Sequence, residues 1–165
     1  MESEGILTAL AEVGIAIAGF SGIVVALQHR SGGWPEIDKF RFNLLLQVSL
    51  VGVFSSLIPI LLHLVNPAKT FVWAWSSGLW LAYILPTVVY RVTRNLPAVT
   101  AASGPVSKFM GAYFITSLTL QVLLQTTNLV WLREPWPHVL TVLLSLLLAS
   151  LLFIRLLRGV IGRSA

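Results

Sequence analysis

Residues 5–28 read GILTALAEVGIAIAGFSGIVVALQ, an uninterrupted apolar stretch that contains a single acidic residue, Glu12. An α-helix of this length spans about 36 Å, which exceeds the ~30 Å hydrocarbon core of a bilayer. Small side chains recur at every fourth position, at Gly14, Ala18, Gly22 and Ala26. Because small residues let membrane helices approach closely, this stripe predicts a transmembrane helix at the centre of a bundle, with several others packed around it.

Glu12 is out of place in such a helix. A carboxylate inside the hydrocarbon costs at least ~2.5 kcal/mol, so it normally faces protein or water and has a partner. Glu12 lies roughly 10 Å beyond the start of the stretch. Two interpretations remain open: a protonatable functional site, or a structural contact that reaches the headgroups or stays protonated beside a polar neighbour.

The composition of the chain indicates the same class of protein. Of its 165 residues, 56% are hydrophobic and only 10% are charged, which leaves too little polar surface to cover a soluble domain. We therefore expect a single transmembrane domain over residues 1–165, an all-α polytopic bundle. The chain has no cysteine, which excludes disulfides and a cysteine nucleophile. Its net charge of +5 is spread over short segments, so we expect no nucleic acid among its partners.

Five apolar runs predict five membrane spans, at about 5–28, 40–65, 71–90, 109–132 and 138–157. Asn66-Pro67 separates the second span from the third, and a turn rich in proline separates the fourth from the fifth. The polar segment 95–107 is predicted to be the longest loop. Pro59 lies inside the second span, where a neighbour must satisfy the carbonyl that the proline leaves free.

The positions of the cations predict an orientation. With five spans, the eleven Lys and Arg residues divide unequally between the two sides. One side holds Arg30, Lys39, Arg41, Arg91, Arg94, Lys108, Arg155, Arg158 and Arg163; the other holds Lys69 and Arg133. Because cytoplasmic segments are enriched in cations, the amino terminus is predicted to lie outside and the carboxyl terminus in the cytoplasm.

A weak internal repeat accompanies this pattern. A Lys-Phe pair opens the second and the fourth span, a proline turn follows each, and an R-x-x-R sequence closes each pair of spans. The residues concerned are Lys39-Phe40 and Lys108-Phe109, Pro67 and Pro135, and Arg91/Arg94 and Arg155/Arg158. The repeat predicts one helix followed by two hairpins of the same orientation. Alternatively, cations simply gather at the cytoplasmic ends of spans.

Polar residues recur along the fourth span at intervals that place them on one helical face. They are Ser117, Gln121, Gln125 and Asn128. Gln125 lies as far from the outer end of its span as Glu12 does from the outer end of the first. We therefore predict that Glu12 faces Gln125 and Asn128. Such amides commonly hold helices together, and they also line polar paths through membranes.

Two histidines, His63 and His138, occur near the predicted outer ends of the second and fifth spans. Histidines on different helices can hold a haem, and together with an acid they can bind a divalent metal. Neither residue lies in a ligand motif, so we expect no cofactor and keep the two as weak candidates for a metal site.

The run Ala11-Glu12-Val13-Gly14-Ile15-Ala16-Ile17-Ala18-Gly19-Phe20, together with residues 42–59 and their Ser55-Ser56-x-x-Pro59 segment, resembles small uncharacterised bacterial inner-membrane proteins. The resemblance covers roughly the first two spans. It implies a location in the bacterial inner membrane and no particular activity.

These observations favour a non-enzymatic scaffold or accessory subunit that acts through helix packing. We expect its partners to be membrane lipids and either copies of itself or a larger membrane complex. One alternative is a small proton-linked transporter or channel that uses Glu12 and the polar face of the fourth span. A second alternative is a haem or metal protein that uses His63 and His138.

Overall fold

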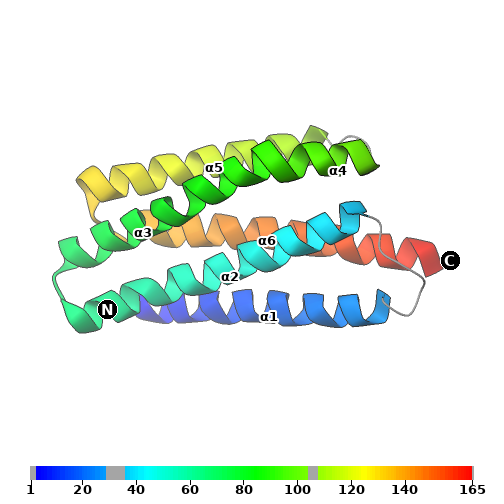
Figure 1. The fold of residues 1–165 in the computed structure, drawn as a ribbon. Helices are drawn as coiled ribbons and strands as arrows, with labels where there is room; N and C mark the ends of the chain where they lie inside the picture. Colours follow the sequence, from blue (N-terminus) through cyan, green and yellow to red (C-terminus); the bar gives the residue numbers. More distant parts are fainter. Residues whose placement is uncertain (1–2, 29–35, 104–107, 165) are drawn as a thin grey trace.

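The computed structural model describes residues 3–28, 36–103 and 108–164, and every regular element in these parts is a helix. The prediction of an all-α protein is therefore confirmed for the described residues. In chain order the elements are α1 (Glu4–Gln28), α2 (Glu36–Val65), α3 (Lys69–Tyr90), the π-helical turn η2 (Arg91–Asn95), α4 (Leu96–Ser103), α5 (Lys108–Thr127), the π-helical turn η3 (Asn128–Leu132) and α6 (Pro135–Ser164) (Figure 1).

Four segments of these helices are long and apolar enough to cross a membrane: Glu4–Val24, Glu36–Val65, Lys69–Ala98 and Pro135–Arg158. They make the chain a helical bundle compatible with a membrane protein. α5 is not among them, because the buried polar side chains Ser117, Gln121 and Gln125 lower its hydropathy. A fifth span at 109–132 therefore stays a prediction.

The helix that begins with α3 continues past the end of the predicted third span. Tyr90, Arg91 and Leu96 all have right-handed helical backbone angles, so α3, η2 and α4 follow one another without a break. The prediction of a loop over 95–107 is wrong for residues 95–103, which are helical, and residues 104–107 lie outside the described parts. Pro97 does not prevent the helix, because it follows the π-helical turn directly, and such local adjustments accommodate proline inside a helix.

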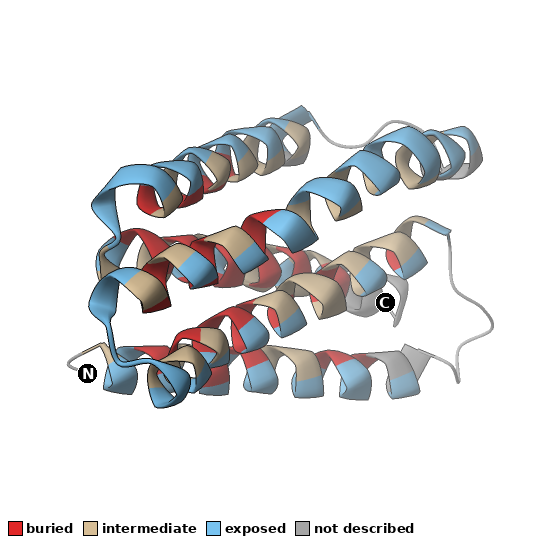
Figure 2. Ribbon diagram, turned by 60° about the vertical axis from the view of Figure 1, so that its left-hand side comes forward, coloured by how far each residue is buried: buried red, intermediate tan, exposed pale blue. Residues whose placement is uncertain are grey.

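α6 occupies the middle of the bundle. It packs against α1, α2, α3 and α5, whereas α1 packs against α2 and α6 and lies along one edge (Figure 1). Buried residues are concentrated where these helices face each other, and the outer faces are exposed (Figure 2). On α6 most of the buried apolar side chains follow helical spacing, at Val142, Leu146, Ala149, Leu152 and Leu156, and Leu148 is buried beside them. The prediction that the first helix lies at the centre is wrong.

The small stripe of α1 contributes to packing through only part of its length. A Cβ on Gly14 would lie 2.8 Å from Cγ2 of Val53 and 3.1 Å from the carbonyl oxygen of Ser49, so α2 approaches closely there. Ala18 is half-buried, and Gly22 and Ala26 are exposed. Residues four apart turn by about 40° around a helix, so a stripe that starts on the buried face leaves it within three steps.

Candidate functional site: a buried polar network

The polar face predicted for the fourth span is present on α5 and η3. Ser117 and Gln121 are 6% and 5% exposed, and Gln125 and Asn128 are completely buried. They come together because their spacings of four, four and three residues keep them on one side of the helix. This side faces α6 and α3. Polar groups buried in a bundle need partners, and the structure provides them from the two neighbouring helices and from the turn before α6.

Gln121 joins α5 to α6 near the middle of the bundle. Its amide nitrogen donates to Oγ of Ser117 at 2.9 Å, and its amide oxygen accepts from Oγ of Ser145 at 3.0 Å. Oγ of Ser145 also lies 3.1 Å from the carbonyl oxygen of Thr141, one helical turn earlier. The side chain of Gln121 is thus used as both donor and acceptor, which orients it rigidly between the two helices.

His138, on α6, is the centre of the network and is completely buried. Its Nε2 lies 2.9 Å from the main-chain oxygen of Ser55 on α2. A carbonyl oxygen only accepts, so Nε2 carries the hydrogen and donates. In the neutral ring Nδ1 is then an acceptor, and it lies 3.2 Å from the amide nitrogen of Gln125. Trp73 packs beside the imidazole, with ring centroids 6.0 Å apart.

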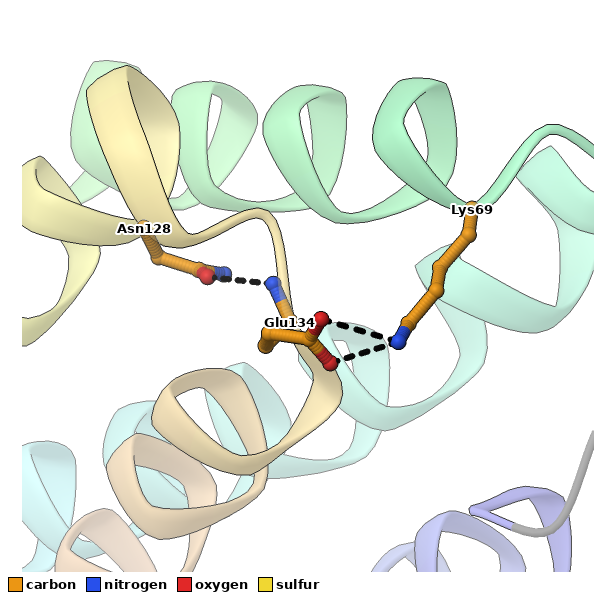
Figure 3. Close-up of polar contacts among 3 residues, drawn as sticks. All are labelled: Lys69, Asn128 and Glu134. Carbon is orange, nitrogen blue, oxygen red and sulfur yellow. Dashed lines mark hydrogen bonds and ion pairs between the residues drawn. The ribbon is translucent and has the colours of Figure 1, made fainter.

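Asn128 extends the network to the end of the bundle where the hairpins turn (Figure 3). Its amide nitrogen donates to Oγ of Ser77 on α3 at 2.9 Å, and its oxygen accepts from the main-chain nitrogen of Glu134 at 2.9 Å. The carboxylate of Glu134 in turn pairs with Nζ of Lys69 at 2.7 Å. Arg133, which directly precedes Glu134 in the chain, has a left-handed backbone conformation with a φ of 53°, and η3 ends there.

Glu12 does not belong to this network. Its side chain is exposed on the outer face of α1, while Gln125 and Asn128 are bonded to other residues. The prediction that Glu12 faces these two amides is wrong. The depth of each residue along its own helix suggested the contact, but α6 lies between α1 and α5 (Figure 1).

The two candidate metal ligands are not brought together. His138 uses both ring nitrogens for protein contacts at the level of Ser55. His63 is eight residues further along α2, which is about 12 Å of helical rise, and its Nδ1 is buried without a partner. Among the described residues, no cluster of three or more His, Cys, Asp or Glu side chains has the arrangement of a metal site.

Sequence reasoning missed the hydroxyl partners of the amides, namely Ser77 and Ser145, and the role of Ser55. One signal was available for Ser55. Pro59 lacks the N–H that would bond the carbonyl four residues earlier, and that carbonyl belongs to Ser55. No local signal identified His138 as the donor that satisfies it.

Two cavities lie in the bundle, the smaller of them beside the network. A small one of about 50 Å³ is lined by Gln121, Ser145 and Arg91. A larger one of about 370 Å³ lies nearer the ends of α3 and α6 and is lined by apolar side chains and by Arg41, Arg91 and Arg155. The larger cavity is bounded by α2, α3, η2, α4, α5 and α6.

Over its described residues the chain is a helical bundle with four long apolar helices, held together internally by buried amide, hydroxyl and imidazole groups. No protein-family model matches this sequence, and no curated protein or solved structure is significantly similar to it.

Proposed function

We propose that the protein crosses a bacterial inner membrane five times, with its amino terminus outside and its carboxyl terminus in the cytoplasm. α5 has 20 residues and packs alongside α3 and α6, so a membrane around those two also surrounds α5. Described cations gather where α2 and α5 begin and where α3 and α6 end, at Lys39, Arg41, Arg91, Arg94, Lys108, Arg155 and Arg158. The hairpin turns at the opposite end hold Lys69 and Arg133. Arg30 lies outside the described residues.

The function that the geometry supports best is a non-enzymatic scaffold or accessory subunit that binds another protein through α1. The observation that carries it is the outer face of α1, where Glu12 is exposed beside small residues. A Cβ placed on Gly5, Gly19 or Gly22 would meet no atom of the bundle within 4 Å. An acid that its own bundle leaves uncovered at membrane depth needs a partner from elsewhere.

The outer face of α1 has the spacing of a helix that pairs with another helix. Gly5, Glu12, Gly19 and Ala26 are seven residues apart and are all exposed. Thr8, Ile15 and Gly22 follow the first three of them by three residues and are also exposed. These seven residues form what we call the seam of α1. Their alternating spacing of three and four residues keeps the seam facing a partner helix in a left-handed pair, and the small residues on it allow close approach.

The occupant that fits this seam is a second copy of the chain. In a parallel pair of α1 helices related by a two-fold axis along the membrane normal, each residue of the seam lies opposite its own symmetry mate. Each Glu12 then lies beside the other. A protonated carboxyl group both donates and accepts a hydrogen bond, so the pair satisfies itself without a separate basic partner.

The transporter alternative depends on Glu12 lying beside the amides of α5. Because Glu12 is on the far side of the bundle from Gln125, the two do not form one polar path. The metal alternative likewise depends on His63 and His138 meeting, and they do not. Neither alternative has a specific observation in its favour.

Single-cysteine crosslinking tests the proposal cleanly, because the chain contains no native cysteine. Gly22→Cys on the seam should form a disulfide-linked dimer when isolated membranes are oxidised with copper phenanthroline. Ala112→Cys, exposed on α5 near the same end of the bundle, is the matched control and should not. Gly19→Leu should abolish the Gly22→Cys dimer while leaving the monomer folded. A wild-type chain that is monomeric in lipid, or equal crosslinking at both positions, contradicts self-association through α1.

A further inference from the structure

The cavity of about 370 Å³ at the cation-rich end of the bundle is not explained by helix pairing through α1. Its volume lies in the range of about 300–1,000 Å³ that small-molecule sites occupy in proteins. Most of its wall is apolar, including Leu44, Phe114 and Leu152, while the charged groups on it are arginines. An elongated ligand with an apolar body and an anionic end suits such a wall.

Two of these arginines have no ion-pair partner among the described residues. Arg41 bonds Asp38, with Nη1 3.0 Å from Oδ1. For Arg91 and Arg155, by contrast, the described parts of the chain supply neither an ion pair nor a hydrogen bond to a side chain. Both are partly buried and border an apolar space. Burying a charge without a counterion is costly, and the guanidinium fork matches the oxygens of a phosphate.

The position of the arginines along the bundle specifies the kind of anion. Arg91 directly follows α3, and Arg155 lies close to Arg158, where the apolar segment of α6 ends. In the proposed orientation, both side chains lie where the hydrocarbon of the cytoplasmic leaflet meets its headgroups. The ligand that meets two arginines and an apolar wall at this level is a lipid of that leaflet.

We propose that this cavity binds one anionic phospholipid, with the phosphate held between Arg91 and Arg155 and an acyl chain lying along Leu44, Phe114 and Leu152. Gly111 leaves room for it on the α5 side, because a Cβ there would meet nothing within 4 Å. The proposal requires that the chain lies in a membrane, and it does not require two chains to associate.

Native mass spectrometry of the detergent-released chain, titrated with dioleoylphosphatidylglycerol or dioleoylphosphatidylcholine, tests the proposal. One phosphatidylglycerol per chain should be retained in clear preference to phosphatidylcholine. Arg91→Gln and Arg155→Gln should each weaken its retention by about tenfold, as expected when a charged hydrogen-bond partner is lost. Arg94→Gln is the matched control: it removes the same charge three residues from Arg91, is exposed, and does not line the cavity.

A second variant separates binding in the cavity from general charge attraction. Gly111→Leu keeps every cation and fills the space for the acyl chain, so it should also displace the lipid. Equal loss in Arg94→Gln, no loss in Gly111→Leu, equal retention of the two lipids, or displacement of the lipid by inorganic phosphate alone would each overturn the proposal. Gly19→Leu should retain the lipid, so a failure of helix pairing and a failure of lipid binding are distinguished.

Discussion

His138 on α6 donates a hydrogen bond from Nε2 to the main-chain oxygen of Ser55 on α2, at 2.9 Å. Ser55 needs this donor because the residue four positions later is Pro59, which has no N–H. The carbonyl that Pro59 leaves free within α2 is thus satisfied by a side chain from α6. The same imidazole contacts Gln125 on α5. His138 thus connects α6, α2 and α5.

His138→Phe should destabilise the fold by roughly 2–4 kcal/mol, because it leaves the Ser55 carbonyl and the Gln125 amide buried without partners. His63→Phe, at the half-buried histidine of α2, is the control and should have a smaller effect. The measurement is the free energy of unfolding in mixed micelles. Equal effects of the two substitutions would contradict the central role of His138.

Pro59→Ala should reduce the cost of losing His138. Alanine restores the N–H at position 59, which can then bond the Ser55 carbonyl within α2. We expect His138→Phe to cost about 1–2 kcal/mol less in the Pro59→Ala background than alone. A double-mutant cycle of unfolding free energies measures this coupling. Strict additivity would show that Pro59 and His138 do not act on the same carbonyl.

Gly14→Ala and Gly19→Ala should change the free energy of unfolding differently, in sign or in size, although both replace a glycine in α1. At Gly14 the added methyl group meets Val53 and the backbone of α2, and we expect a loss of about 1–3 kcal/mol. At Gly19 it meets nothing in the bundle, so within a single chain the better helix propensity of alanine should leave stability equal or up to ~1 kcal/mol higher. Thermal unfolding of monomeric protein in detergent checks both.

Asn128→Ala should destabilise the hairpin end of the bundle more than Lys69→Ala does. Asn128 is completely buried and satisfies both Ser77 and the Glu134 nitrogen, so its loss should cost about 1–3 kcal/mol. The ion pair of Lys69 with Glu134 has side chains 60% and 41% exposed, and should contribute less than ~1 kcal/mol. The unfolding free energies of the two variants show whether the buried amide or the surface ion pair contributes more to the stability of this end of the bundle.

Arg133→Gly should stabilise the protein by about 0.5–1 kcal/mol. Arg133 has a φ of 53°, a left-handed conformation that glycine adopts without a steric penalty from Cβ. Arg158→Gly removes the same charge from an exposed, right-handed position in α6, where glycine should cost about 1 kcal/mol. Melting temperatures should therefore move in opposite directions.

The sequence predicted the features that depend on neighbours along the chain. The apolar runs located the long helices, because hydropathy and length are local properties. The polar face of Ser117, Gln121, Gln125 and Asn128 was predictable from spacing alone, since helical periodicity is constant. The free carbonyl that Pro59 creates also follows from local chemistry. The helical residues 95–103 escaped prediction, because proline and small polar residues there occur equally in loops.

Only the tertiary structure decided which residues meet. Sequence spacing gives the depth of Glu12 and Gln125 along their own helices, but it does not give the rotation of each helix about its axis, which decides the neighbour that each face meets. That rotation results from packing among residues far apart in the chain, such as Gly14 against Val53 and His138 against Ser55. For this reason α6 rather than α1 occupies the centre, Gln125 bonds His138, and Glu12 faces outward.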